Sequence, residues 1–160
     1  MGGPPPLPPK PKYPAGAYVL PVPKGVVKIT MGMVKSPPAS FKGHLVIPEG
    51  IRVIDEGCFA PEFGAEFGAI KNIIELTLPE ILKKIDEIAF TAHELRKITI
   101  GADVQLVESQ WTFTDGDDKA SEPIPFTRYA MPEEFQNAYT EIYGSATGTY
   151  IKKDDTWEMV

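Results

Sequence analysis

Short runs with apolar residues at alternate positions recur through the middle of the chain. Residues 45–47 read Leu-Val-Ile, residues 76–78 read Leu-Thr-Leu and residues 98–100 read Ile-Thr-Ile, and each run is closed by Pro or Gly. A period of two places the two outer side chains of each run on one face of a strand. The pattern predicts three short strands, each with one buried face.

These strands belong to an internal repeat. Residues 45–59 align with residues 76–90 without a gap, at an offset of 31 residues, and a third copy begins at residue 98, only 22 residues after the second. Residues 62–69 read Glu-Phe-Gly-Ala twice, and removal of these eight residues brings the first spacing close to the second. We interpret residues 62–69 as a loop insertion and expect that its deletion leaves cooperative unfolding intact.

The repeat predicts the fold class. A single unit cannot bury its apolar residues alone, so neighbouring units must stack. After each strand a second apolar pair turns the chain inward, and Phe59 or Phe90 fills the inside of the coil. The expected fold is α/β, a short solenoid with parallel strands along one face and with flanking segments that cap its ends.

The motif is specific enough to suggest a family. Residues 76–90 and 95–100 read Leu-Thr-Leu-Pro, then Leu, Ile and Ala-Phe at fixed spacing, then Leu-Arg-Lys-Ile-Thr-Ile. This resembles the BspA-type leucine-rich repeat over residues 43–104, and residues 148–159 look like the closing hairpin that follows such repeats. The family consists mostly of surface or secreted proteins of host-associated bacteria, with some in protozoa, and several are regarded as adhesins.

The resemblance implies a short leucine-rich-repeat solenoid, a right-handed superhelix with parallel strands and a C-terminal β-hairpin cap. The corresponding domain of residues 25–160 divides into an N-terminal cap at 25–42, repeats at 43–104 and a C-terminal cap at 105–160. Residues 105–134 do not fit the repeat pattern.

The first 24 residues form a proline-rich arm. Nine of the 17 prolines lie before residue 24, and proline fixes φ and removes a backbone donor, so Pro4 to Pro23 are expected to be extended, unpacked chain. A stiff spacer is the simpler interpretation. The alternative is a ligand for a partner domain, because residues 5–10 match the P-x-x-P-x-basic pattern that SH3 domains bind.

Charge and composition narrow the classes of function. The formal net charge is −6, with 16 Lys and Arg against 22 Asp and Glu, which argues against a nucleic-acid partner and against a polybasic membrane patch. No apolar run approaches the ~18–20 residues of a membrane span. The single cysteine, Cys58, excludes an internal disulfide and a cysteine-rich zinc site. No signal peptide is visible, so the chain is expected to be cytoplasmic or a mature chain whose leader has been removed.

Candidate catalytic and metal-binding residues each have a simpler explanation. Cys58, which could pair with His44 or His93, occupies the repeat position of the small Ala89, and neither histidine has a partner at a repeat position. Asp103 and the acidic residues 115–118 lack the remainder of a calcium loop. Residues 55–56 and 86–87 both read Asp-Glu, which indicates the exposed side of a recurring turn. The sequence predicts no catalytic residue, cofactor or metal.

Aromatic and outward-facing residues are better candidates for binding. Phe63 and Phe67 lie in the duplicated loop, where they fold back over the repeats or contact a partner. The outward strand positions Val46, Thr77 and Thr99 line the face that this architecture uses for recognition. Four more aromatic residues are expected to build the C-terminal cap: Trp111, Phe113, Phe126 and Tyr129.

The sequence therefore predicts a non-catalytic protein-binding module. By resemblance it is an adhesin-like protein, at the cell surface or secreted, that contacts a partner protein such as a host extracellular protein. The alternative is a structural or intracellular scaffold whose proline-rich arm is recognised by a partner domain. An enzyme built on residues 105–134 would need a convergent set of catalytic side chains that this segment does not offer.

Overall fold

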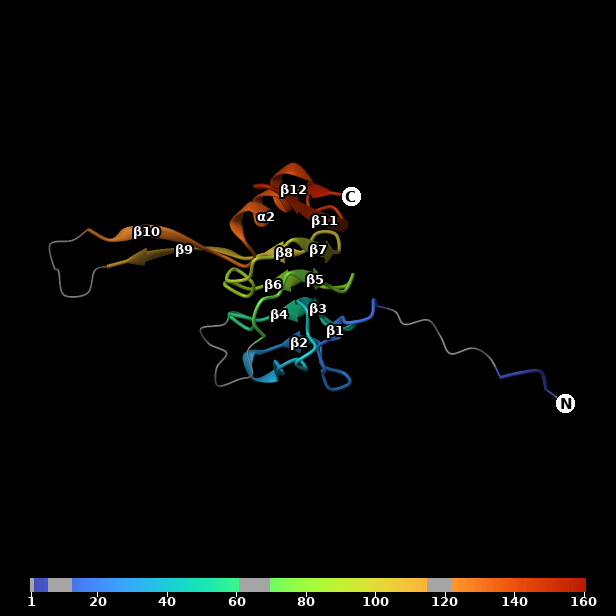
Figure 1. Cartoon of the computed structure of the whole chain (residues 1–160). Helices are drawn as coiled ribbons and strands as arrows, with labels where there is room; N and C mark the ends of the chain where they lie inside the picture. Colours follow the sequence, from blue (N-terminus) through green and yellow to red (C-terminus); the bar gives the residue numbers. More distant parts are fainter. Residues whose placement is uncertain (1, 6–12, 61–69, 115–121) are drawn as a thin grey trace.

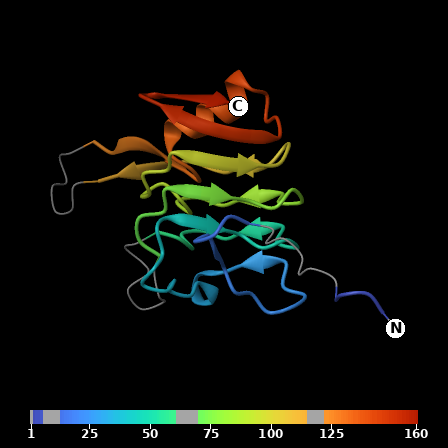
Figure 2. The same cartoon turned by 45° about the vertical axis from the view of Figure 1, so that its right-hand side comes forward.

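A computed structural model describes residues 2–5, 13–60, 70–114 and 122–160 of the chain (Figure 1). In this part of the chain the fold is mixed α/β, made mostly of sheets with one short α-helix, α2. The predicted α/β class is correct at this level. The strands are stacked from the N-terminal to the C-terminal end of the chain, and the C-terminal segment lies over the last of them (Figures 1 and 2).

The larger sheet follows the repeat. Its order is β1-β3-β5-β7-β11-β12, and the first four strands are parallel. Leu45 lies in register with Leu76, which lies in register with Ile98, so equivalent residues of the three copies are neighbours in the sheet. Its strands are β1 (Tyr18–Val19), β3 (His44–Val46), β5 (Glu75–Thr77), β7 (Lys97–Ile100), β11 (Gly148–Lys153) and β12 (Thr156–Met159).

A second parallel sheet has the order β2-β4-β6-β8. Each unit that gives one strand to the first sheet gives the next strand to the second, so β3 is followed by β4, β5 by β6 and β7 by β8. The internal repeat of the sequence is therefore also a repeat of structure. The elements are β2 (Lys28–Ile29), the 3-10 turn η1 (Met31–Met33), β4 (Val53–Ile54), β6 (Lys84–Ile85) and β8 (Gln105–Leu106).

The hydrophobic core contains the inward residues of both sheets. Ile54 and Ile85 are fully buried neighbours in the second sheet. The rings of Phe59 and Phe90 are stacked with their centroids 4.8 Å apart, as the expected filling of the coil requires. Cys58 is buried in this core, as its repeat position predicted.

The end of the N-terminal arm is packed, and the expectation of an unpacked chain as far as residue 24 is wrong. Tyr18 and Val19 form strand β1, which pairs with β3. Leu20 is 1% exposed and belongs to the core, and its N–H donates to the carbonyl of Val46 at 2.9 Å. The prolines on either side of this strand restrict the chain without preventing three consecutive non-proline residues from pairing.

The C-terminal segment closes the last repeat. Strand β11 pairs antiparallel with β7 on one side and with β12 on the other, which confirms the closing hairpin predicted for residues 148–159. Helix α2 (Glu133–Asn137) and the π-helical turn η2 (Ala138–Ile142) precede it. Their buried aromatic residues form one cluster with those of the hairpin: Phe135, Tyr139, Tyr150 and Trp157.

Tyr139 attaches this cap to the third repeat. Its hydroxyl donates to the carbonyl of Gly101 at 2.7 Å and accepts the N–H of Val104 at 3.1 Å. Burial raises the pKa of Tyr139 further above its ordinary value, at which the hydroxyl is already protonated at neutral pH.

Strands β9 (Glu108–Phe113) and β10 (Ile124–Tyr129) form a separate antiparallel hairpin that projects from the side of the stack (Figures 1 and 2). The prediction that Trp111, Phe113 and Phe126 build the C-terminal cap is wrong, whereas Tyr129 at the base of the hairpin contacts the cap through Glu133. Trp111, Phe113 and Phe126 all lie on the projecting hairpin and are exposed.

Candidate protein-contact site

Hairpin β9–β10 carries its apolar side chains on one face. Directly opposed residues of an antiparallel pair share a face, and so do residues two apart along each strand. Trp111 is opposite Phe126, and Phe113 is opposite Ile124, so the four side chains form one continuous surface. Their exposed fractions are 43%, 38%, 56% and 61%, respectively. We call these four residues the apolar face.

The other face of the hairpin is polar over most of its length. Gln110 is opposite Thr127, and the side-chain amide of Gln110 donates to the Thr127 hydroxyl at 2.9 Å. Within the described residues, β9 and β10 pair only with each other. A two-stranded ribbon with one apolar face open to solvent is marginal by itself, so its base must be held by the rest of the chain.

A buried carboxylate holds that base. Glu87 is 8% exposed and accepts hydrogen bonds from the Ser109 hydroxyl and, at 3.3 Å, from the Trp111 indole N–H. Nη1 of Arg128 lies 3.7 Å from Oε1 of Glu87. The guanidinium carbon of Arg128 lies 3.9 Å from the centroid of the Trp111 ring. Trp111 is therefore fixed by a hydrogen bond at its edge and a cation on its face.

This arrangement corrects the reading of the repeated Asp-Glu pairs. Glu87 was expected on the exposed side of a turn, but hairpin β9–β10 covers it. The equivalent Glu56 keeps a side chain that is 54% exposed, with its carboxylate 4.0 Å from Arg128. The repeat places the carboxylates of Glu56 and Glu87 next to each other. Hairpin β9–β10 supplies hydrogen-bond donors to Glu87 alone.

The two carboxyls have pKa values shifted in opposite directions. The hydrogen bond from Ser109, followed by that from Trp111, lowers the pKa of Glu87 below its ordinary value. Partial desolvation, followed by a hydrogen bond shared with Glu87, raises the pKa of Glu56. As pH falls, the first proton therefore goes to Glu56, and Glu87 remains the acceptor for the hairpin.

Gln136 of α2 fastens the C-terminal end of the hairpin. Its side chain is buried, accepts the backbone N–H groups of Ala130 and Met131 at 3.1 Å and donates to the carbonyl of Leu106 at 3.2 Å. The repeat itself adds the N–H of Ile88, which donates to the carbonyl of Tyr129 at 2.8 Å. The apolar face is thus presented from a base that is tied to both the second repeat and the cap.

The outward residues of the larger sheet are less available than expected. Val46 is fully buried, so its prediction as a contact residue is wrong. Thr77 and Thr99 are partly exposed, but both hydroxyls are engaged. The Thr77 hydroxyl lies 2.8 Å from Nε2 of His44, and the Thr99 hydroxyl lies 3.1 Å from that of Thr149.

His44 has partners that the repeat pattern does not reveal. Besides Thr77, its Nδ1 lies 3.0 Å from a carboxylate oxygen of Glu75. The order of carboxylate, imidazole and hydroxyl is that of a catalytic triad. Acyl transfer also needs donors for an oxyanion, and the nearby N–H of Leu78 is used by the carbonyl of Thr99. These contacts connect β3 and β5 through their side chains.

Cys58 and His93 do not form a catalytic pair. Burial raises the pKa of Cys58 to about 12, and its Sγ donates to the carbonyl of Ile29 at 3.2 Å. Nε2 of His93 lies 2.5 Å from the carbonyl of Phe59, and its Nδ1 accepts the N–H of Ile73. Both side chains connect neighbouring units of the core.

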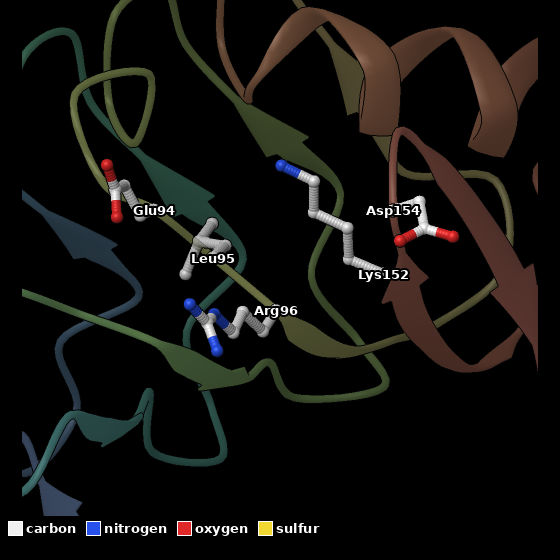
Figure 3. A pocket seen from close by; sticks show the side chains of 5 residues that line it. All are labelled: Glu94, Leu95, Arg96, Lys152 and Asp154. Atoms are coloured by element: carbon white, nitrogen blue, oxygen red, sulfur yellow. The ribbon is translucent and has the colours of Figure 1, made fainter.

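A cavity of about 430 Å³ lies beside the closing hairpin and contains charges of both signs. Figure 3 shows Arg96 and Lys152 between Glu94 on one side and Asp154 on the other, with Leu95 between Glu94 and Arg96. Lys152 and Arg96 are neighbours because the N–H of Lys152 donates to the carbonyl of Arg96 at 2.9 Å. The four charged side chains are exposed, which makes any ion they bind weakly held.

Some predicted residues lie outside the described part of the chain. These are Phe63, Phe67 and the acidic residues 115–118. In the described part, no group of three His, Cys, Asp or Glu residues is arranged to hold a metal ion. No helix there has the length and hydropathy required to cross a membrane.

Comparison with protein-family models, with curated proteins and with solved structures found no match. Function therefore has to be inferred from the geometry of the chain itself.

Proposed function

We propose that this chain is a non-catalytic protein-binding module in which a short leucine-rich-repeat solenoid carries hairpin β9–β10 as its contact element. The observation that carries the proposal is the apolar face, four large side chains exposed together on a hairpin whose base is held by hydrogen bonds to Glu87 and Gln136. Contiguous exposed apolar surface marks interaction sites in soluble proteins. Trp and other aromatic residues are enriched among the residues that dominate binding energy.

The solenoid assignment is supported by the regular alternation between the two parallel sheets and by the register of equivalent residues. Stacked units of this kind form a stiff body from which a recognition element can project. The resemblance to BspA-type repeats extends the proposal to an adhesin-like protein at the cell surface or outside the cell. Its partner is then an extracellular protein such as one of a host.

The test is capture of identified proteins from serum and extracellular matrix by the immobilised full chain. We expect the double variant Phe113→Ser/Ile124→Ser to lose that capture, because both side chains are exposed and neither contributes to the base of the hairpin. Ile142→Ser is the matched control, since Ile142 is 72% exposed but lies on η2. Capture that is equal in all three proteins would refute the apolar face as the contact element.

The same experiment addresses the scaffold alternative. Removal of residues 1–12 leaves β1 and the whole described stack in place. Capture that disappears with those residues, and not with the hairpin substitutions, would identify the proline-rich arm as the recognised element.

A further inference from the structure

A second surface lies at the base of the same hairpin and has a different chemistry. A cavity of about 520 Å³ opens there, beside β10 and the start of α2. Tyr129 supplies an aromatic ring on the polar face of β10, Pro132 extends the apolar part, and Phe126 and Arg128 of the opposite face also contribute to the lining. Glu133 and Glu134 supply two exposed carboxylates on its rim. We call this space the basal cavity.

The basal cavity suits an extended proline-rich segment that carries a cation. Polyproline segments dock in aromatic-lined grooves, because their rings stack on flat side chains and their backbone loses little entropy on binding. A nearby carboxylate then selects a basic residue in the ligand. The Tyr129 hydroxyl, which donates to Glu133 at 3.1 Å, holds ring and carboxylate together at one side of the cavity.

The chain itself contains a segment with this composition. Residues 4–14 hold seven prolines, with Lys10 and Lys12 among them. The charge of the chain is also strongly divided. The first 48 residues contain six lysines and no acidic residue, whereas the other 112 contain all 22 acidic residues and ten basic ones, a formal charge of −12. The basic N-terminal part of one molecule is therefore complementary to the acidic remainder of another.

We propose that residues 4–14 of one copy of this chain bind in the basal cavity of a second copy, with prolines on Tyr129 and Pro132 and lysines paired with Glu133 and Glu134. The inference rests on the proposed function, since it uses the same hairpin as a binding element. It goes beyond that function because it names residues 4–14 as the segment that binds, and because it predicts that copies of the chain associate head to tail. A heterologous contact of this kind links successive molecules.

The position of the chain just before β1 favours a second copy over the same molecule. Residues 13–17, which lead into β1, lie on the side of the stack away from hairpin β9–β10 (Figure 1).

The test uses a synthetic peptide of residues 2–14 titrated into the full chain, with sedimentation velocity of the full chain alone. We expect the peptide to bind and the chain to associate with rising concentration. The double variant Glu133→Gln/Glu134→Gln should weaken both by about tenfold, because each lysine loses its partner. Glu141→Gln, a neutralisation on η2 away from the cavity, should change neither. A peptide with Lys10 and Lys12 replaced by Glu should bind more weakly than the original.

Three results would overturn this inference. One is a peptide that does not bind the full chain or the chain lacking residues 1–12. Another is binding that is equal in Glu133→Gln/Glu134→Gln and in the parent. The third is peptide binding only after residues 1–12 are removed from a chain that stays monomeric, which would show that each molecule fills its own cavity. Failure of the peptide together with capture that depends on Phe113 and Ile124 would remove this inference and leave the proposed function standing.

Discussion

The rings of Phe59 and Phe90 lie 10° from parallel with their centroids 4.8 Å apart, although the two residues are separated by 30 others in the chain. They occupy equivalent positions of two repeats and are at most 2% exposed. Because β4 and β6 pair in register just before them, each ring is placed directly above the next. Equivalent residues of the two repeats are therefore neighbours in the core as well as in the sheet.

Replacing Phe90 with alanine should remove one half of this stack. We expect Phe90→Ala to lower the free energy of unfolding by about 3–5 kcal/mol, the usual loss for truncation of a buried phenylalanine. Urea denaturation followed by circular dichroism measures it. Phe126→Ala on the projecting hairpin is the control and should cost much less, since Phe126 is already 38% exposed. Equal losses in the two variants would contradict the stacked core.

The repeat explains which parts of the fold can be predicted from the sequence. Leu45, Leu76 and Ile98 occupy one repeat position, and all three lie in register in the larger sheet. Because stacked repeats give equivalent residues the same surroundings, their burial can be predicted from the alignment. Strand β1 has no such support: its residues lie among prolines, and they are ordered by pairing with β3 and by contacts of Tyr18 with distant residues. Burial of Val46, likewise, depends on tertiary neighbours and not on the period of the strand.

The candidate site was harder to predict because it depends on an element outside the repeat. Alternation at Ser109, Trp111 and Phe113 is a strand signal, but it does not say whether another element covers that face. Hairpin β9–β10 is attached to the second repeat. This attachment both buries Glu87 and leaves the apolar face exposed. Nothing in the repeat pattern distinguishes Glu87 from Glu56.

Ile88 adopts a backbone conformation that β-branched residues avoid. Its φ is 52°, and Gly57 at the equivalent repeat position has a φ of 65°. The left-handed region costs a non-glycine residue roughly 1–2 kcal/mol. We expect Ile88→Asn to be as stable as the parent or more stable by up to about 1 kcal/mol, since Asn tolerates this region.

Thermal and urea unfolding of Ile88→Asn would measure this effect. Gly57→Ala provides the opposite control, because it introduces a side chain at a positive φ and should lower stability by about 1 kcal/mol. A clear loss of stability in Ile88→Asn would mean that contacts of the isoleucine side chain outweigh the relief of backbone strain.

Cys58 should be unreactive in the folded chain. With its pKa raised to about 12 by burial, almost no thiolate forms at neutral pH, and the thiolate is the reacting species. We expect a thiol reagent to label Cys58 only at the rate of unfolding, and labelling to become complete in denaturant. Rapid labelling of the native chain would contradict the buried position and reopen the question of a functional thiol.

Attachment of the hairpin should depend on pH in two stages. The lowered pKa of Glu87 means that its contribution to stability is present above the ordinary glutamate range and is lost as pH falls through the lower value of the folded state. The raised pKa of Glu56 acts in the opposite sense, because the folded chain binds that proton more readily than the unfolded chain. Mild acidification should therefore keep the hairpin attached, and stronger acidification should release it.

Trp111 emission reports this attachment, with Trp157→Phe as the background so that Trp111 is the one tryptophan of the chain. Between about pH 8 and about pH 3, we expect emission to stay constant through the ordinary glutamate range and then to shift to the red. Glu87→Gln should already be shifted at neutral pH, with a loss on the order of 1 kcal/mol. Glu56→Gln should behave like the parent at neutral pH or attach slightly better, because it resembles the protonated side chain.

The contrast between the two glutamine variants decides the assignment. Glu56 and Glu87 hold equivalent places in successive repeats and differ in that the hairpin donates two hydrogen bonds to Glu87. If both variants released Trp111 equally at neutral pH, a general loss of negative charge beside Arg128 would account for the result. If only Glu87→Gln released it, the single buried acceptor would be what holds the apolar face in position for a partner.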